Sequence, residues 1–347
     1  MIIPFFHAHA RSWLLIPGLL LPLGPLQVLA NTVSDCGVTA STDCYFAFTP
    51  AGSAGRIHFY ASRAPGTGAP TTALVAIHGH PRDANTSFNA ALAAVQSGGA
   101  LNRSLVVAPL FQVSAADAAP CHTAGVPAAQ DGDLLWTCAS WIAGGKARKT
   151  PTAQGLSSFT ALDALVVELH RQWPSLQTVT IAGFSAGAQL VQHYIGFAAM
   201  PPAPMAVRYV VADPGTWLYF DPVWPDATVA ACPQVQRWKY GLEHRPTNLG
   251  RNGIEARTHY AQAEIHYLEG ALDSSDAPRT SYKILNKSCA AMAQGPYRLQ
   301  RGLAYAEYDR KVLAPEKQRN VTVVPGCAHD VACVFSADEA RSALLGH

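Results

Sequence analysis

The stretch from Thr178 to Gln192 restricts the fold of this chain more than any other. It begins with a run of β-branched residues, continues into the corner Gly183-Phe184-Ser185-Ala186-Gly187, and ends in the start of an amphipathic helix. A strand, a sharp turn and a helix in this order place the serine hydroxyl at an exposed tip, with glycines where a side chain would collide with neighbouring backbone. The stretch therefore predicts a strand-turn-helix unit built around Ser185.

Apolar, β-branched runs alternate with stretches of helical spacing along most of the chain. The buried-strand runs are 73–78, 104–111, 178–182, 206–213, 264–270 and 321–325, and the helical stretches are 86–96, 157–173, 186–197 and the C-terminal segment from Ser336. Strands that alternate with helices form a mostly parallel sheet with helices on both faces. We therefore predict an α/β fold, opened by two antiparallel strands at 44–48 and 56–61.

The first thirty residues do not fit this alternation. An apolar run extends from Trp13 to Leu29, and Val28-Leu29-Ala30 suits a signal peptidase. A membrane anchor is the alternative, but prolines and glycines interrupt the run, which is barely long enough to span a bilayer. We expect a cleaved signal peptide at 1–30, then one domain over 31–347, and a secreted or periplasmic protein without a stable membrane anchor.

Two long stretches, about 112–155 and 214–262, have no clear hydrophobic period. Connections of this length are usually functional or decorated loops, so we expect two irregular insertions in the domain. The chain has 347 residues, 49% of them apolar, and a formal net charge of +2. This charge is too small to indicate nucleic acid as a partner.

Eight cysteines follow the predicted signal peptide. They are Cys36, Cys44, Cys121, Cys138, Cys232, Cys289, Cys327 and Cys333. An even number without a C-x-x-C pair favours disulfides over zinc in an exported protein. Eight cysteines allow 105 pairings, and we predict that neighbours along the chain pair with one another.

A serine hydroxyl becomes a good nucleophile only when a base takes its proton, so Ser185 needs a histidine that a carboxylate holds. Reactive residues gather at the carboxyl ends of parallel strands. His329 follows the last predicted strand, between Cys327 and Cys333, and Asp273 follows the strand before it. Asp213, after the preceding strand, is the alternative acid, and Asp276 is a third candidate.

With Ser185, Asp273 and His329 in this order, the chain resembles the α/β-hydrolase family from about Ile57 to the C-terminus. The resemblance implies an eight-stranded sheet and an activity in the range of secreted esterases, lipases and polyester depolymerases. It also implies an oxyanion hole of two N–H donors. We expect the amides of Ala186 and His80, with Arg82 as a second choice for the latter, because Pro81 has no N–H.

We therefore expect a secreted hydrolase of carboxylic esters that acts on a small or polymeric ester through an acyl-enzyme, as a monomer. No metal or other cofactor is expected. A serine peptidase of the same fold and a non-catalytic binding protein on this scaffold are the alternatives, since a fold does not fix a function. A metallohydrolase is a weaker alternative: the pattern His78-x-His80-x-x-Asp83 resembles a metal motif, but its spacing is wrong and it lacks the final ligand.

Overall fold

The structure, a computed structural model, describes residues 1, 2, 4, 36–148, 155–225, 232–278 and 280–346. The chain divides into two units, Met1–Val33 and Ser34–His347, and all strands and helices below belong to the second. The predicted signal peptide lies almost entirely outside the described residues. Within the described part of the chain, no helix combines the length and the hydropathy needed to span a bilayer.

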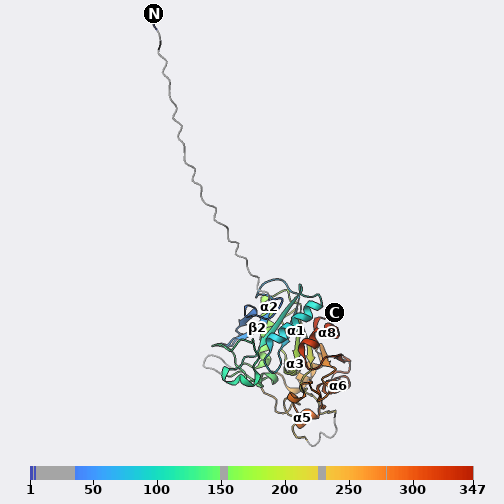
Figure 1. The fold of residues 1–347 in the computed structure, drawn as a ribbon. Helices are drawn as coiled ribbons and strands as arrows, with labels where there is room; N and C mark the ends of the chain where they lie inside the picture. The colour runs from blue at the N-terminus through green and yellow to red at the C-terminus, as the bar shows by residue number, and fades with distance from the viewer. Residues whose placement is uncertain (3, 5–35, 149–154, 226–231, 279, 347) are drawn as a thin grey trace. The chain divides into compact units, whose positions relative to one another are not determined.

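A sheet with helices around it forms the centre of the second unit (Figure 1). It is open and has eight strands in the order β1-β2-β4-β3-β5-β6-β7-β8. The strands are β1 (Tyr45–Phe48), β2 (Ile57–Ala61), β3 (Thr72–Ile77), β4 (Ser104–Leu110), β5 (Thr178–Phe184), β6 (Ala206–Ala212), β7 (Ile265–Gly270) and β8 (Val321–Val324). β1 and β4 flank β2 in antiparallel orientation, and the remaining neighbours are parallel. The predicted α/β class, the antiparallel opening and the eight strands are confirmed.

Helices connect these strands and cover both faces of the sheet. They are α1 (Ala84–Ser97), α2 (Ser158–Gln172), α3 (Ala186–Phe197), α4 (Gly253–Gln262), α5 (Cys289–Met292), α6 (Arg298–Tyr308), which continues into the π-helical turn Asp309–Leu313, α7 (Val331–Ser336) and α8 (Asp338–Leu345). The prediction of a wholly irregular insertion at 214–262 is wrong for its last ten residues, which form α4. A capping box between Asn252 and Glu255 starts this helix, and only Ala256 and Tyr260 on it are buried, so its apolar periodicity is weak.

The strands are apolar on both sides because each side packs against a separate layer of helices. On β3, Val75 and Ile77 belong to a core that includes residues of α2, α3, α4 and α6. Leu74 and Ala76 point to the other side, into a core with residues of α1, α7 and α8. Successive side chains of a strand alternate between faces, and a strand buried on both faces reads as a continuous apolar run.

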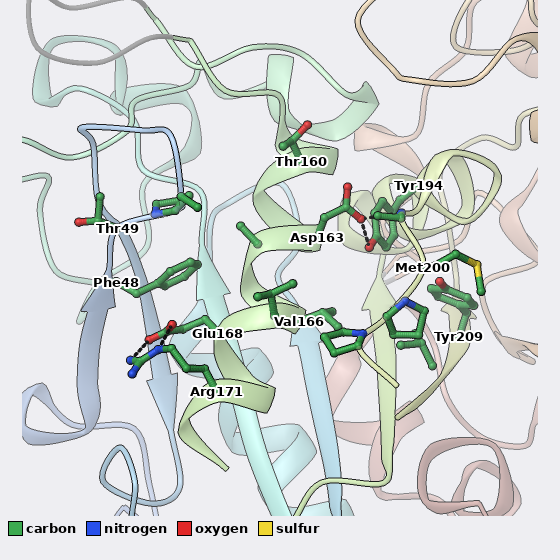
Figure 2. A pocket seen from close by; sticks show the side chains of 18 residues that line it. Phe48, Thr49, Thr160, Asp163, Val166, Glu168, Arg171, Tyr194, Met200 and Tyr209 are labelled. Atoms are coloured by element: carbon green, nitrogen blue, oxygen red, sulfur yellow. Dashed lines mark hydrogen bonds and ion pairs between the residues drawn. The ribbon is translucent and has the colours of Figure 1, made fainter. Parts of the chain in front are cut away.

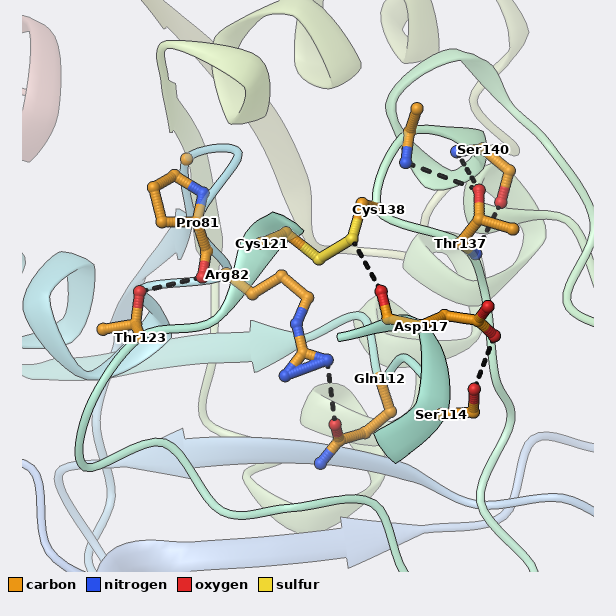
Figure 3. The surroundings of a disulfide bond; sticks show 12 residues. Pro81, Arg82, Gln112, Ser114, Asp117, Cys121, Thr123, Thr137, Cys138 and Ser140 are labelled. Atoms are coloured by element: carbon orange, nitrogen blue, oxygen red, sulfur yellow. Dashed lines mark hydrogen bonds between the residues drawn. A yellow bond between two sulfur atoms is a disulfide. The ribbon is translucent and has the colours of Figure 1, made fainter. Parts of the chain in front are cut away.

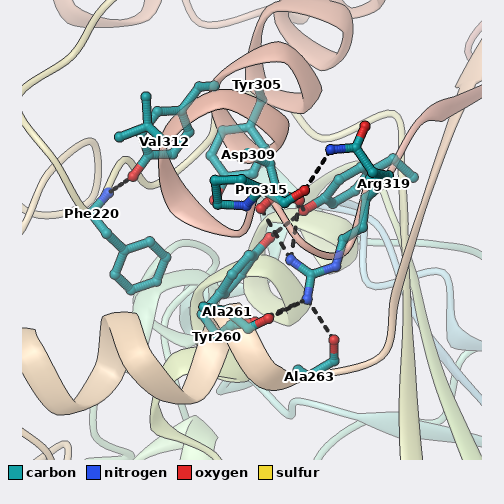
Figure 4. Close-up of polar contacts among 12 residues, drawn as sticks. Phe220, Tyr260, Ala261, Ala263, Tyr305, Asp309, Val312, Pro315 and Arg319 are labelled. Carbon is teal, nitrogen blue, oxygen red and sulfur yellow. Dashed lines mark hydrogen bonds and ion pairs between the residues drawn. The ribbon is translucent and has the colours of Figure 1, made fainter.

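Buried polar groups join the later elements of the fold. The guanidinium of Arg319 donates to both carboxylate oxygens of Asp309 at 3.1 Å and to backbone carbonyls at the end of α4, among them those of Ala261 and Ala263 (Figure 4). The last carbonyls of a helix have no partner inside it. Arg319 therefore satisfies the end of α4 and connects it to the π-helical turn.

Four disulfides close loops around the sheet. They join Cys36 to Cys44, Cys121 to Cys138, Cys232 to Cys289, and Cys327 to Cys333. This is the pairing of neighbours that the sequence predicts.

The packing of α2 gives a stability prediction with an internal control. We expect Leu165→Ala to lower the free energy of unfolding by about 2–5 kcal/mol, because Leu165 is buried between α2 and the sheet and its loss leaves a cavity. Val167→Ala, at an exposed position of the same helix, should change it by less than about 0.5 kcal/mol. Urea denaturation followed by tryptophan fluorescence measures both, and equal effects would contradict the burial of this helix face.

Candidate functional site

Ser185 stands at the turn between β5 and α3, in a backbone conformation that side chains rarely adopt. Its φ is 57° and its ψ is −119°, and strain of this kind is typical of a nucleophile elbow. A Cβ at Gly183 would lie 2.3 Å from the carbonyl oxygen of Gly187, and a Cβ at Gly187 would lie 2.3 Å from that of Ile77. The Ser185 amide donates to the carbonyl of Ala212 on β6 at 3.0 Å, which fixes the turn to the neighbouring strand.

Ser185, Asp273 and His329 meet at the carboxyl edge of the sheet. Nε2 of His329 lies 2.8 Å from Oγ of Ser185, and its Nδ1 lies 2.9 Å from Oδ2 of Asp273. The second contact has the length of a hydrogen bond without its alignment. The His329 and Asp273 side chains are 6% and 3% exposed, so water screens their interaction little. The structure thus brings together the three residues that the sequence singles out.

Backbone contacts hold the loop of Asp273 against the loop of His329. The amide of Leu272 donates to the carbonyl of Cys327 at 2.9 Å, and that of Ala271 donates to the end of β8. Gly270 permits this approach, because a Cβ there would lie 2.7 Å from the Cys327 carbonyl oxygen. The disulfide that Cys327 forms closes the short segment that carries His329.

Asp273 is also paired with a cation that the sequence analysis did not identify. Nη1 of Arg298, the first residue of α6, donates to both oxygens of the Asp273 carboxylate at 3.2 Å. Both side chains are 3% exposed. The guanidinium fixes the carboxylate and neutralises part of its charge.

The alternative acid Asp213 lies close to this group, but its contacts differ. Polar atoms of Asp213, Asp273 and His329 lie within 4.8 Å of one another. Oδ1 of Asp213 accepts from the amide of Gly270 at 2.9 Å, and no described residue links Asp213 to the ring of His329 by a hydrogen bond. Asp276, the third candidate, is exposed on the surface.

Sequence reasoning also missed Glu269, the second-last residue of β7, which is completely buried. It lies beside Asp213, because Ala212 on β6 is paired with Leu268 on β7 and the amide of Asp213 donates to the carbonyl of Leu268 at 3.0 Å. Charged residues are almost never fully buried without a partner. A glutamate inside the apolar run 264–270 was therefore a signal that the sequence contained.

In the turn Gly79–Arg82 after β3, the amide of His80 is open to an oxyanion. The amide of Gly79 donates to the carboxylate of Asp83 at 2.8 Å, and that of Arg82 donates to the carbonyl of Gly79 at 3.1 Å. Pro81 has no N–H. Among the described residues, the His80 amide alone in this turn has no acceptor, so the second choice, Arg82, is unavailable.

Residues of the insertion at 112–155 contact the His80 loop and hold it in place. Thr123 donates to the carbonyl of Pro81 at 2.8 Å, next to the disulfide between Cys121 and Cys138 (Figure 3). Arg82 extends beneath this disulfide toward Gln112, with its Nη1 3.5 Å from the amide oxygen. The position of the loop therefore depends on a segment outside the sheet.

The weak metal pattern in the same loop has a structural explanation. His78 is completely buried, and its pKa is lowered to about 4 by burial. Its Nδ1 contacts the carbonyl of Gly79 at 2.8 Å, and its Nε2 accepts from the amide of Phe111 at 3.2 Å. Both ring nitrogens of His78 are therefore engaged, so His78 is not free to bind a metal ion.

A surface pocket of about 470 Å³ lies away from these residues (Figure 2). It is lined by the outer side of α2, the segment after β1 and the segment after α3, and it includes none of Ser185, Asp273 and His329. Within it, the hydroxyl of Tyr194 donates to Asp163 at 2.8 Å. Its walls are mostly apolar, and no serine, cysteine or histidine lines it, so we do not assign the reaction to it.

No protein-family model matches the chain, and no curated protein sequence matches it. Poly(aspartic acid) hydrolase-1 from Sphingomonas sp. KT-1 is similar in structure, with 20% identity and a TM-score of 0.57 over 86% of this chain and 97% of that one. The poly(3-hydroxybutyrate) depolymerase from Bordetella parapertussis has 17% identity and a TM-score of 0.58 over 87% and 90%. Similarity at these identities establishes the fold.

A substitution at Gly187 tests whether the steric clash of an added Cβ outweighs the higher helix propensity of alanine. Alanine favours a helix over glycine by about 1 kcal/mol, but Gly187→Ala places a Cβ against the carbonyls of Ile77 and His78. We expect a net loss of about 1–3 kcal/mol in the free energy of unfolding and a displaced Ser185 that reacts more slowly with a fluorophosphonate.

Gly37→Ala is the matched control, because a Cβ there meets no atom within 4 Å. It should leave both the stability and the labelling rate unchanged. Labelling of Gly187→Ala at the wild-type rate would contradict the tight approach of the elbow to β3.

Proposed function

We propose that this chain, which has the α/β-hydrolase fold, is a serine hydrolase that cleaves carboxylic esters through an acyl-enzyme. One observation carries the proposal: Nε2 of His329 lies 2.8 Å from Oγ of Ser185. A base within hydrogen-bonding distance is what turns a serine hydroxyl into a nucleophile. The carboxylate of Asp273, 2.9 Å from the other ring nitrogen, supports the same assignment.

The roles of the three residues follow from this arrangement. Ser185 Oγ attacks the carbonyl carbon of the ester while its proton passes to Nε2 of His329. The charged imidazole is stabilised by Asp273, and it then returns the proton to the leaving alcohol. A water molecule then attacks the acyl-enzyme, giving its proton to His329. The proton returns to Ser185 Oγ as the acid leaves.

The negative charge on the tetrahedral intermediate needs N–H donors. We assign this role to the amides of Ala186 and His80. Ala186 is the first residue of α3, where a backbone N–H has no acceptor within the helix. His80 is the amide of its turn that has no acceptor among the described residues.

The substrate class is an ester of a small molecule or of a polymer. Both structural neighbours with the same fold are named for the hydrolysis of polymers, one a polyester and one a polyamide. These names place poly(3-hydroxybutyrate) and poly(aspartic acid) among the substrates to test. A monomer without a cofactor is still our expectation.

We also propose that the protein works outside the cytoplasm. Disulfides form and persist in oxidising compartments, and the chain contains four of them. The predicted signal peptide supports the same location. Secretion from the cell and retention in a periplasm both agree with these features.

The central test is Ser185→Ala. We expect kcat on p-nitrophenyl butyrate to fall by at least about 10⁴-fold with the melting temperature unchanged, because the nucleophile is lost and the fold is kept. Ser97→Ala, at an exposed position at the end of α1, is the matched control and should retain full activity. Activity of Ser185→Ala near the wild-type level would refute the assignment.

A substrate panel then separates the alternatives. It contains p-nitrophenyl esters of graded acyl length, a feruloyl ester, a poly(3-hydroxybutyrate) film, poly(aspartic acid) and a peptide amide. Faster cleavage of the peptide amide than of any ester would identify a peptidase. A folded protein whose Ser185 resists fluorophosphonates and which cleaves nothing would be a binding protein.

A further inference from the structure

Two buried carboxyl groups lie beside the acid of the proposed triad. Asp213 follows β6 and Glu269 is on β7, and both are completely buried. Asp213 directly follows Ala212, whose partner across the two parallel strands is Leu268, the residue before Glu269, so the two carboxyl groups lie side by side. Among the described residues, neither forms an ion pair with a lysine or arginine. Two carboxyl groups that are buried side by side do not readily ionise together, so one of them carries a proton. The question is which one holds it and what the other then does.

The donors around the pair indicate where the proton is. Oδ1 of Asp213 accepts from the Gly270 amide at 2.9 Å, whereas no donor of the described residues reaches either oxygen of Glu269. The Glu269 carboxyl is also packed against α6, where a Cβ at Gly302 would lie 2.1 Å from its Oε1. Burial raises the pKa of both carboxyl groups, and for Glu269, which the neighbouring Asp213 affects further, the pKa is well above its usual range. At Asp213, nearby His329 and the Gly270 amide oppose the rise in pKa. The proton therefore belongs on Glu269, and Oδ2 of Asp213, which no described donor reaches, is the acceptor open to it.

The charges around His329 show what the ionised Asp213 contributes. Arg298 on α6 is paired with Asp273, so this pair together carries no net charge. Arg301, one turn further along α6, donates to backbone carbonyls, including that of Gly295. When His329 takes the proton of Ser185, the carboxylate of Asp273 is already balanced by a cation. Asp213, within 4.8 Å of this group, supplies the remaining negative charge.

We propose that Glu269 is a protonated hydrogen-bond donor that keeps Asp213 ionised, and that Asp213 acts as a second carboxylate stabilising the charged imidazole of His329. Asp213 and Glu269 are thus positioning residues, which act through His329 and do not touch the substrate. The inference rests on the proposed function of Ser185 and His329. Two carboxylates, Asp273 and Asp213, then stabilise the charged form of His329, where the proposed triad alone has one.

The test follows the rate at which a fluorophosphonate labels Ser185 as a function of pH, because this rate needs no knowledge of the substrate. In Asp213→Asn, the loss of a negative charge near His329 should lower the pH of the acid limb by about one unit and the plateau rate by about tenfold. Glu269→Gln keeps an N–H donor to Asp213 and should match the wild type in both. Glu269→Met keeps the length but not the donor, so Asp213 takes up a proton and the variant should resemble Asp213→Asn.

Two results would overturn the proposal. One is an Asp213→Asn variant with the wild-type acid limb and a rate within twofold of wild type. The other is a Glu269→Gln variant as impaired as Asp213→Asn, which would make Glu269 itself the charged group. A failure to label wild-type Ser185 would instead refute the proposed function, so the two failures are distinguishable.

A spectroscopic measurement tests the proton without any variant having to react. In protein labelled with ¹³C at the glutamate carboxyl carbon, infrared spectra at neutral pH should contain the carbonyl band of one protonated carboxyl group. The band should be absent from Glu269→Gln. Wild-type protein without this band at neutral pH would overturn the proposal even if the variants did not fold.

Discussion

The close approach of the turn at Ser185 to its neighbouring strands is the constraint on which the site depends. The turn fits only because Gly183 and Gly187 lack side chains, and the backbone of Ser185 is held at a positive φ by the hydrogen bond to Ala212. A conformation of this kind costs of order 1–3 kcal/mol and persists only when the surrounding structure enforces it. Here the enforcement comes from the central strands β3, β5 and β6, which are buried on both faces.

The acid side of the site is organised differently, by charge. Asp273 holds His329 on one side and Arg298 on the other, and Asp213 and Glu269 lie behind them. Buried charges are tolerated only when they are paired and hydrogen-bonded. Removing one of these side chains would therefore leave its buried partner without compensation and destabilise the group. Catalytic geometry and folding stability share the same contacts at this edge of the sheet.

The main features of the site could be predicted from sequence because they follow from strand order. A parallel sheet brings the ends of its strands together, so Ser185, Asp273 and His329 could be chosen as residues that follow strands. Arg298 could not be chosen in this way, because it begins a helix whose buried face also carries Arg301, Gly302 and Tyr305 in place of aliphatic residues. Periodicity does not detect such a face. The contact between Glu269 and Asp213 is likewise long-range, and no local pattern specifies it.

The four disulfides lie in the loops and short helical segments around the sheet, and the sheet itself contains none. None of the eight cysteines lies in a strand of the sheet, and each bridge closes a loop or a short helical segment around it. One bridge closes the segment whose Thr123 contacts the loop of His80, and another closes the segment that carries His329. A host cell that produces this chain in a reducing cytosol would therefore supply every residue of the sheet but not the covalent closure of these loops. A preparation could therefore have a high yield of folded protein and a low specific activity. The specific activity would depend on whether the expression compartment allows disulfides to form.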